Sequence, residues 1–320
     1  MYENWKVAII GTGTMGMGIG QIFAANRFYV TLVDQNEALL ERAKKMIDGN
    51  CDYLMGEKLV DSGYKTRALE NLHYITNDHL EQAVADADLI IEAVFESPDV
   101  KRDVYEKLSR FCRPDCIFCS NTSGSNVFEI AKVTHPERFL ITHWFNPPFI
   151  MDLVEIVRGP GTSDEVTESV RRIIAHLGKK PVVIQQYIPG FIVNRLANAL
   201  MREACYMVDQ GWTTPQDIDD AVKAVNGVRY AFEGPFALYD VVGWDLVQSV
   251  AVDLFKSLCN DTEGFDLARR MIDEGALGIK SGKGAYDYTG VDTVQYMNDR
   301  SSKIVKMYRA IQELSEGADV

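Results

Sequence analysis

The stretch "VAIIGTGTMGMGIGQIFAANRFYVTLVD", Val7–Asp34, decides the fold class of this chain. An apolar, strand-like run ends at Gly11, and Gly13 and Gly16 complete a G-x-G-x-x-G spacing before a helical segment. The first glycine permits a tight turn, the second lets the backbone approach a pyrophosphate, and the third lets the helix pack against the strand. The stretch therefore predicts a strand–turn–helix unit whose helix N-terminus holds the phosphates of a dinucleotide.

The end of the next strand-like run indicates which dinucleotide binds. That run ends in Asp34, and no basic residue adjoins it in "VDQNE". A carboxylate here accepts hydrogen bonds from the adenosine ribose and repels a 2′-phosphate, which favours NAD over NADP. A flavin could use the same turn, and a purely structural turn with an incidental aspartate is the non-functional alternative.

Short apolar runs alternate with amphipathic, helix-like stretches along the first 186 residues. This alternation predicts an α/β fold with a mostly parallel sheet covered by helices on both faces. The expected strands are 6–10, 29–33, 72–76, 88–94, 116–121, 138–145, 153–157 and 180–186.

The pattern of apolar residues changes after "YIPGF": from there on it has helical periodicity and almost no strand signal. We therefore expect two domains: a dinucleotide-binding domain of Rossmann type over 1–186 and an all-helical domain over 187–320. "TTPQDIDDAV" predicts a helix start with a threonine cap, a proline and acidic residues in the first turn. "SSKIVKMYRAIQEL" predicts an extra helix near the C-terminus.

Composition excludes several classes of protein. With 320 residues, 47% of them apolar, the chain can form a full core. A net charge of −13 with scattered basic residues argues against nucleic acid as a partner. No signal-peptide pattern or membrane-length apolar run is present, which predicts a cytoplasmic protein. Cys112, Cys116 and Cys119 lack the second half of a zinc site, so we expect reduced thiols and no metal.

Two ionisable residues stand in unusual, apolar surroundings. His143 ends the run "RFLITHWF", and Glu155 lies within "LVEIV" after an "NPP" turn. Each alone is better explained as a satisfied core residue. On neighbouring strands, however, the carboxylate would orient the imidazole and stabilise its protonated form, leaving the other ring nitrogen as a base. That arrangement suits a hydride-transfer enzyme.

With these motifs in order, nearly the whole chain resembles the NAD-dependent L-3-hydroxyacyl-CoA dehydrogenase family. The matching segments are "TMGMGIGQ", "EAVFESPDVKRDVY", "SNTSG", "HWFNP", "LVEIV", "PGFIVNRL" and "LGIKSGKGAYDY". The resemblance implies that His143 is the catalytic base with Glu155 as its partner, and that Ser123 and Asn194 contact the substrate. It also implies the following cofactor-binding residues: Gly11, Gly13, Thr14, Met15, Gly16, Asp34, Glu96, Lys101, Asn121, Asn146 and Lys280.

Two segments depart from the CoA-thioester members of the family. "GVRYAFEGPFALYD" and "NPPFIMDLVE" look more like a side branch that includes gulonate dehydrogenase (lambda-crystallin), carnitine dehydrogenase and hydroxymethyl-pyridine-carboxylate dehydrogenases. That branch implies a small hydroxy acid or alcohol-carboxylate as substrate, held by Arg229. A genuine 3-hydroxyacyl-CoA dehydrogenase remains the alternative, and a non-catalytic, crystallin-like NAD-binding protein is a remote one.

Two further expectations concern the space left for the substrate and the oligomeric state. Trp144, Tyr230 and Phe232 would fill space that an acyl chain needs, whereas Lys58 and Lys65 could still meet the phosphates of CoA. The helical domain has more apolar stretches than a small bundle needs, and the resembling family dimerises through it. We therefore expect a homodimer.

Overall fold

The computed structural model describes residues 5–315 of the chain. The chain divides into two compact units, Met1–Val193 and Asn194–Val320. The domain boundary predicted from the sequence, at 186 and 187, lies just before this division. Each unit is described by itself below.

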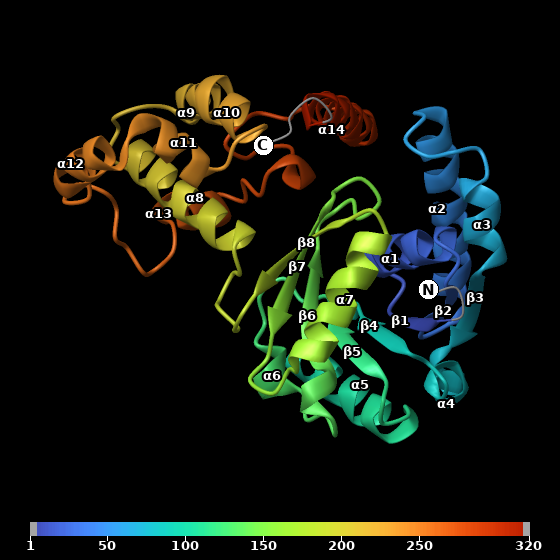
Figure 1. The fold of residues 1–320 in the computed structure, drawn as a ribbon. Coiled ribbons are helices and arrows are strands. Elements are labelled where there is room, and N and C mark those ends of the chain that lie inside the picture. The colour runs from blue at the N-terminus through green and yellow to red at the C-terminus, as the bar shows by residue number, and fades with distance from the viewer. Residues whose placement is uncertain (1–4, 316–320) are drawn as a thin grey trace. The chain divides into compact units, whose positions relative to one another are not determined.

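The first unit is built around one eight-stranded sheet in the order β3-β2-β1-β4-β5-β6-β7-β8 (Figure 1). All neighbouring pairs are parallel except β6 and β7, which form an antiparallel pair. The mostly parallel sheet predicted from the sequence is therefore confirmed. The strands are β1 Lys6–Ile10, β2 Tyr29–Asp34, β3 Leu72–Thr76, β4 Leu89–Glu92, β5 Ile117–Ser120, β6 Phe139–Trp144, β7 Leu153–Arg158 and β8 Lys180–Ile184.

Helices cover both faces of this sheet, as strand alternation requires. Ala8 and Ile10 of β1 join a buried cluster with Tyr105 and Leu108 on one face. Ile9, between them, points to the opposite face, where it lies against the glycine side of α1. The helices of this unit are α1 Thr14–Ala25, α2 Glu37–Gly56, α3 Tyr64–Glu70, α4 Leu80–Val84, α5 Pro98–Phe111, α6 Val127–Ile130 and α7 Asp164–His176, with short 3₁₀ turns at Asn77–His79 and Pro136–Arg138.

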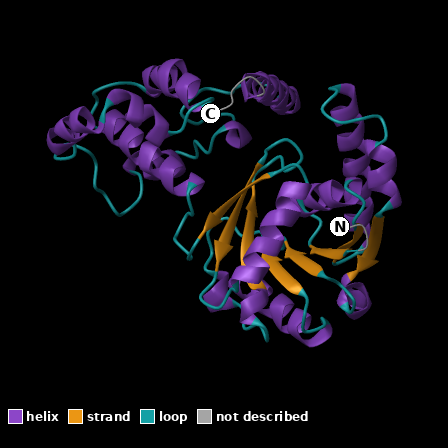
Figure 2. Cartoon of the chain, in the orientation of Figure 1, coloured by secondary structure: helices purple, strands orange, loops and turns teal. Residues whose placement is uncertain are grey.

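The second unit consists of helices and loops, in contrast to the strands of the first (Figure 2). Thr214 caps one of these helices by accepting a hydrogen bond from the backbone N–H of Asp217, as its sequence predicts. The helices are α8 Val193–Asp209, which begins in the first unit, α9 Pro215–Ala221, α10 Val228–Tyr230, α11 Pro235–Val242, α12 Trp244–Leu254, α13 Asp266–Asp273 and α14 Thr293–Ser315, with a π-helical segment at Val222–Gly227 and a 3₁₀ turn at Ile279–Ser281.

The second unit buries few apolar side chains. Among its described residues, the buried apolar ones are Cys205, Cys259, Ala276 and Val305. Large apolar side chains are instead exposed along its helices, including Phe236, Val241, Leu246, Val250 and Phe255. A single unit with so much exposed apolar surface is typical of a protein that covers it with a partner.

The described part of the chain holds no helix that is both long and apolar enough to cross a bilayer. In residues 5–315, no group of three or more His, Cys, Asp or Glu side chains could hold a metal ion. The six cysteines are free thiols, and Cys119 is buried in β5, where burial raises the pKa of its thiol to about 12. A cytoplasmic location stays a prediction from the sequence.

Candidate active site

One edge of the sheet carries the predicted polar residues that belong to the first unit. The parallel strands β1, β2, β4, β5 and β6 all end at this edge, and the strand order reverses between β1 and β4. Ligands of open α/β sheets bind in the crevice at such a reversal.

The glycine turn after β1 is shaped for close approach of backbone and ligand. Gly11 has a φ of 96°, and a Cβ atom there would lie 2.6 Å from the carbonyl oxygen of Ala93. A Cβ at Gly16 would lie 1.9 Å from the carbonyl oxygen of Gly11, so the helix packs on the turn only without a side chain. A Cβ at Gly13 would meet nothing within 4 Å, and no side chain caps α1, which begins with Thr14 and Met15. The amides of the first turn of α1 therefore face open space suited to a pyrophosphate.

Asp34 ties the end of β2 to this turn. Its Oδ2 accepts hydrogen bonds from the backbone N–H of Thr12 at 2.7 Å and from the Thr12 hydroxyl at 2.6 Å. Sequence analysis missed Thr12, because an x position of the glycine motif carries no signal of its own. The carboxylate thus stands beside the turn at the end of β2, where an adenosine ribose would lie.

A buried charged network lies at the ends of β4 and β5. The Lys101 ammonium, on α5, lies 2.8 and 3.0 Å from the two carboxylate oxygens of Glu92, and both side chains are almost fully buried. Ser120 and Tyr105 donate hydroxyl hydrogen bonds to Glu92 at 2.6 and 3.3 Å. The Lys101 ammonium also lies 3.5 Å from Glu96. Lys101 is therefore anchored by Glu92, a residue that sequence analysis did not select.

The loop after β5 is attached to this network. Thr122 donates its hydroxyl hydrogen bond to Glu96 at 2.5 Å. Burial alone would raise the pKa of Glu96, but hydrogen bonds from Ser125 and Thr122 and the Lys101 charge hold it below its usual range. Asn121 accepts the backbone N–H of Trp144 at 3.0 Å, which links this loop to the end of β6. Ser123 is exposed on the same loop.

His143 and Glu155 meet, as predicted, on neighbouring strands. They are directly opposite in the antiparallel β6–β7 pair, and His143 Nδ1 lies 2.7 Å from Glu155 Oε2. The side chain of His143 is 6% exposed and that of Glu155 is fully buried. Glu155 Oε1 accepts the backbone N–H groups of Ile192 and Val193 at 2.9 and 3.0 Å.

The charge state of Glu155 follows from these contacts. Burial by itself would raise the pKa of the Glu155 carboxyl, but the hydrogen bonds from His143, Val193 and Ile192 outweigh it and hold the pKa below the usual range. Glu155 is therefore a carboxylate at neutral pH. Because it engages Nδ1, the other ring nitrogen of His143, Nε2, is the one available as a base.

Trp144 does not occupy the position expected for it. Its side chain is 2% exposed and packs against Phe23 of α1, with ring centroids 6.2 Å apart. Neighbouring residues of a strand point to opposite faces, so Trp144 points away from the side chain of His143. The expectation that Trp144 restricts the substrate space is wrong. Asn146 is exposed two residues further on.

The remaining predicted residues belong to the second unit. Asn194 lies near the start of α8, where its carbonyl accepts a hydrogen bond from the Asn198 side chain at 2.9 Å. Arg229 is exposed on α10, and within residues 5–315 no ion pair engages it. Lys280 is exposed in the 3₁₀ turn Ile279–Ser281.

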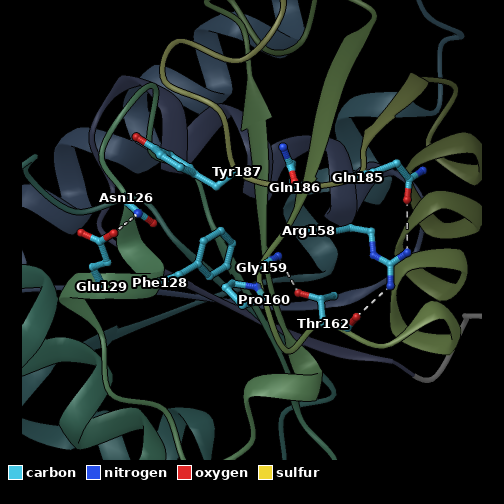
Figure 3. Close-up of a pocket in the computed structure, with 10 residues that line it drawn as sticks. All are labelled: Asn126, Phe128, Glu129, Arg158, Gly159, Pro160, Thr162, Gln185, Gln186 and Tyr187. Atoms are coloured by element: carbon cyan, nitrogen blue, oxygen red, sulfur yellow. Dashed lines mark hydrogen bonds between the residues drawn. The ribbon is translucent and has the colours of Figure 1, made fainter.

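A separate cavity of about 630 Å³ lies at the other end of β7, beside α6 (Figure 3). Arg158, in its lining, is opposite Leu140 at the start of β6, whereas the His143–Glu155 pair lies nearer the end of that strand. The Arg158 guanidinium is engaged by the Gln185 side chain and the Thr162 carbonyl oxygen. None of the residues predicted for the active site lines this cavity.

A parallel sheet with this glycine turn and a buried His–Glu pair at the same edge defines an NAD-dependent dehydrogenase. Residues 6–187 match the family model "3-hydroxyacyl-CoA dehydrogenase, NAD binding domain", and residues 190–288 match "3-hydroxyacyl-CoA dehydrogenase, C-terminal domain". The chain belongs to the 3-hydroxyacyl-CoA dehydrogenase family. Its first domain binds NAD, and the second is the family's helical domain.

Similar proteins include members with different named substrates. The chain is 34% identical to 5-formyl-3-hydroxy-2-methylpyridine 4-carboxylate 5-dehydrogenase of Mesorhizobium japonicum, over 96% of this chain and 98% of that protein. A crystal structure of an enzyme of that name, described as an NAD+ dependent dismutase, has a TM-score of 0.87 at 32% identity and covers 98% of this chain and 99% of its own. The (S)-3-hydroxybutyryl-CoA dehydrogenase of Ralstonia eutropha has a TM-score of 0.73 at 30% identity, over 88% of this chain and 98% of its own.

Proposed function

We propose that this enzyme uses NAD to oxidise a secondary hydroxyl group in a small hydroxy acid or alcohol-carboxylate. The buried His143–Glu155 pair, joined at 2.7 Å, carries the proposal for the reaction type. His143 Nε2 takes the hydroxyl proton, and Glu155 holds the ring and offsets the positive charge of the imidazolium. NAD, held by the glycine turn and Asp34, would supply the acceptor for the hydride that leaves the same carbon, so that alcohol and NAD+ would give ketone, NADH and a proton.

The other active-site residues receive positioning and binding roles. Ser123, on the loop after β5, and Asn194, at the start of α8, hydrogen-bond the substrate oxygens. Glu96, in the loop after β4, approaches the nicotinamide ribose, together with Lys101 of α5, whose buried ammonium lies 3.5 Å from Glu96. The remaining residues proposed to contact the cofactor are the glycine-turn residues, Asp34, Asn121, Asn146 and Lys280.

Cofactor choice provides a first prediction. The kcat/KM with NAD is expected to exceed that with NADP by about 10- to 100-fold, the worth of a charge-assisted hydrogen bond to the ribose. Asp34→Ser is expected to reduce this ratio by a similar factor. Thr12→Val is the matched control, because it removes a hydroxyl hydrogen bond to Asp34 but keeps its charge. Equal values for the two cofactors in the wild-type enzyme would remove the role given to Asp34.

Two observations favour a compact substrate that carries its own carboxylate. The relative from Mesorhizobium japonicum is named for a pyridine carboxylate, and the exposed Arg229 guanidinium is a planar cation suited to a carboxylate. Lys65, one of two lysines that could meet CoA phosphates, instead bridges Asp48 and Asp52 at 2.8 Å each. A 3-hydroxyacyl-CoA substrate is the second candidate, supported by the similarity to the (S)-3-hydroxybutyryl-CoA dehydrogenase.

Substrate profiling with a charge deletion tests this choice. The kcat/KM for the best free hydroxy acid is expected to exceed that for 3-hydroxybutyryl-CoA. Arg229→Met is expected to lower the kcat/KM for the free hydroxy acid by about 10- to 100-fold, because a charged hydrogen bond is lost. Lys223→Met removes another cation of the same domain, one paired with Asp220, and serves as the control. Preference for the CoA thioester, unchanged in Arg229→Met, would make this an ordinary 3-hydroxyacyl-CoA dehydrogenase.

We also propose that the enzyme is a homodimer whose helical domains cover each other's exposed apolar side chains. Light scattering at micromolar concentration is expected to give the mass of two chains. Phe236→Glu, at a side chain 75% exposed, should reduce it, whereas Phe95→Glu, at an 81% exposed side chain of the first domain, should not. A wild-type mass of one chain would contradict the proposal.

A further inference from the structure

The segment that joins the two units contains an unusual backbone turn. Gly190 and Phe191 both have positive φ values, 77° and 51°. For glycine this conformation is ordinary, but for a bulky residue such as Phe191 it is strained. The Phe191 side chain is nevertheless fully buried. Such a strained conformation persists only where the surroundings determine it strongly, and it is often found at functional sites.

The turn brings three groups onto the His143–Glu155 pair. The backbone N–H groups of Ile192 and Val193 donate to Glu155 Oε1. The Phe191 ring lies against the His143 imidazole, with centroids 5.4 Å apart at an interplanar angle of 60°. One turn therefore contacts both members of the pair: its amides donate to Oε1 of Glu155, whereas Nδ1 of His143 meets Oε2.

The same segment is attached to the loop that carries Ser123. The Tyr187 hydroxyl donates to the Gly124 carbonyl oxygen at 2.7 Å, and the Tyr187 ring lies 6.1 Å from that of Phe191. Phe145 contacts the His143 ring as well, with centroids 4.4 Å apart. The imidazole thus lies among aromatic rings rather than in loosely packed aliphatic surroundings.

We propose that Phe191 is a positioning residue that sets the orientation of the His143 imidazole; this inference rests on the proposed function of His143 as the base. The hydrogen bond to Glu155 fixes the position of Nδ1, but the ring can still tilt about that contact. The edge-on contact of Phe191 and the tilted contact of Phe145 restrict this tilt and so direct Nε2. The strained turn is retained because it places the Phe191 ring and the amides of Ile192 and Val193 together.

The test compares two substitutions of fully buried phenylalanines in the same domain. Phe191→Leu keeps much of the volume but removes the ring beside His143. Phe28→Leu makes the same change beside Phe23 and His176, which lie outside the proposed machinery. Phe191→Leu is expected to lower kcat by about 10- to 100-fold, as a small misplacement of a reacting group does. Phe28→Leu should leave kcat within about twofold of wild type, and both should keep the NAD dissociation constant.

A spectroscopic measurement without substrate tests positioning separately from turnover. The proton in the short His143–Glu155 hydrogen bond is expected to give a far-downfield proton NMR signal. Phe191→Leu should shift or broaden it, and Phe28→Leu should not. If Phe191→Leu does not fold, Phe191→Met takes its place. An unchanged signal, or a kcat equal to that of Phe28→Leu, would overturn the inference. The His143→Gln variant is measured in parallel. If it retains turnover, the proposed function of His143 as the base fails. If it loses turnover, the result for Phe191→Leu tests the positioning role alone.

Discussion

Replacing His143 with glutamine is expected to lower kcat by at least about 10²-fold while NAD still binds, the loss typical of a general base. Glutamine keeps a polar side chain of similar length but cannot take a proton from the substrate hydroxyl. The cofactor contacts proposed for the glycine turn and Asp34 do not involve position 143, so the dissociation constant of NAD should stay near the wild-type value.

The matched control is His135→Gln. His135 lies in the same domain and also faces a carboxylate, with its Nδ1 3.1 Å from Glu137, but its side chain is 40% exposed. Its replacement should leave kcat and KM unchanged. A His143→Gln enzyme that keeps turnover within about tenfold of wild type would reject His143 as the base.

Local sequence pattern predicts much of this site because local geometry determines it. The strands that carry His143 and Glu155 are joined by only the eight residues 145–152, so an antiparallel pair that aligns the two residues is the simplest arrangement. The glycine motif fixes its own turn by steric exclusion at Gly11 and Gly16. Strand alternation also places Trp144 on the face opposite His143, which rules out the role expected for its bulk at the substrate.

Other features depend on contacts between residues far apart in the chain. The amides that bind Glu155 come from Ile192 and Val193, 37 and 38 residues later. The identity of a residue does not show whether its backbone N–H makes such a contact. A positive φ at Phe191 is equally invisible, because sequence signals for that conformation come from glycine and asparagine. Glu92 lies inside the predicted strand 88–94, and only the packing of α5 on the sheet reveals its ammonium partner.

The buried ion pair of Lys101 with Glu92 carries the second large effect. Lys101→Met is expected to lower the free energy of unfolding of the cofactor-free enzyme by about 3–5 kcal/mol. The Lys101 and Glu92 side chains are 1% and 0% exposed. Removal of the ammonium leaves the carboxylate charged and buried, and among residues 5–315 its remaining donors are the hydroxyls of Ser120 and Tyr105 and the amide of Val94. Urea unfolding of wild type and variant measures the loss.

Two further variants separate the buried charge from the loss of a lysine. Lys107→Met changes the same residue type on the same helix, but Lys107 forms an exposed pair with Asp103 at 2.7 Å, so a change within about 0.5 kcal/mol is expected. Glu92→Gln combined with Lys101→Met removes both charges and should regain much of the lost stability, because no uncompensated carboxylate remains. A Lys101→Met loss no larger than that of Lys107→Met would show that the pair contributes little. A loss that persists undiminished in the double variant would instead assign the effect to the packing of the buried lysine chain, not to its charge.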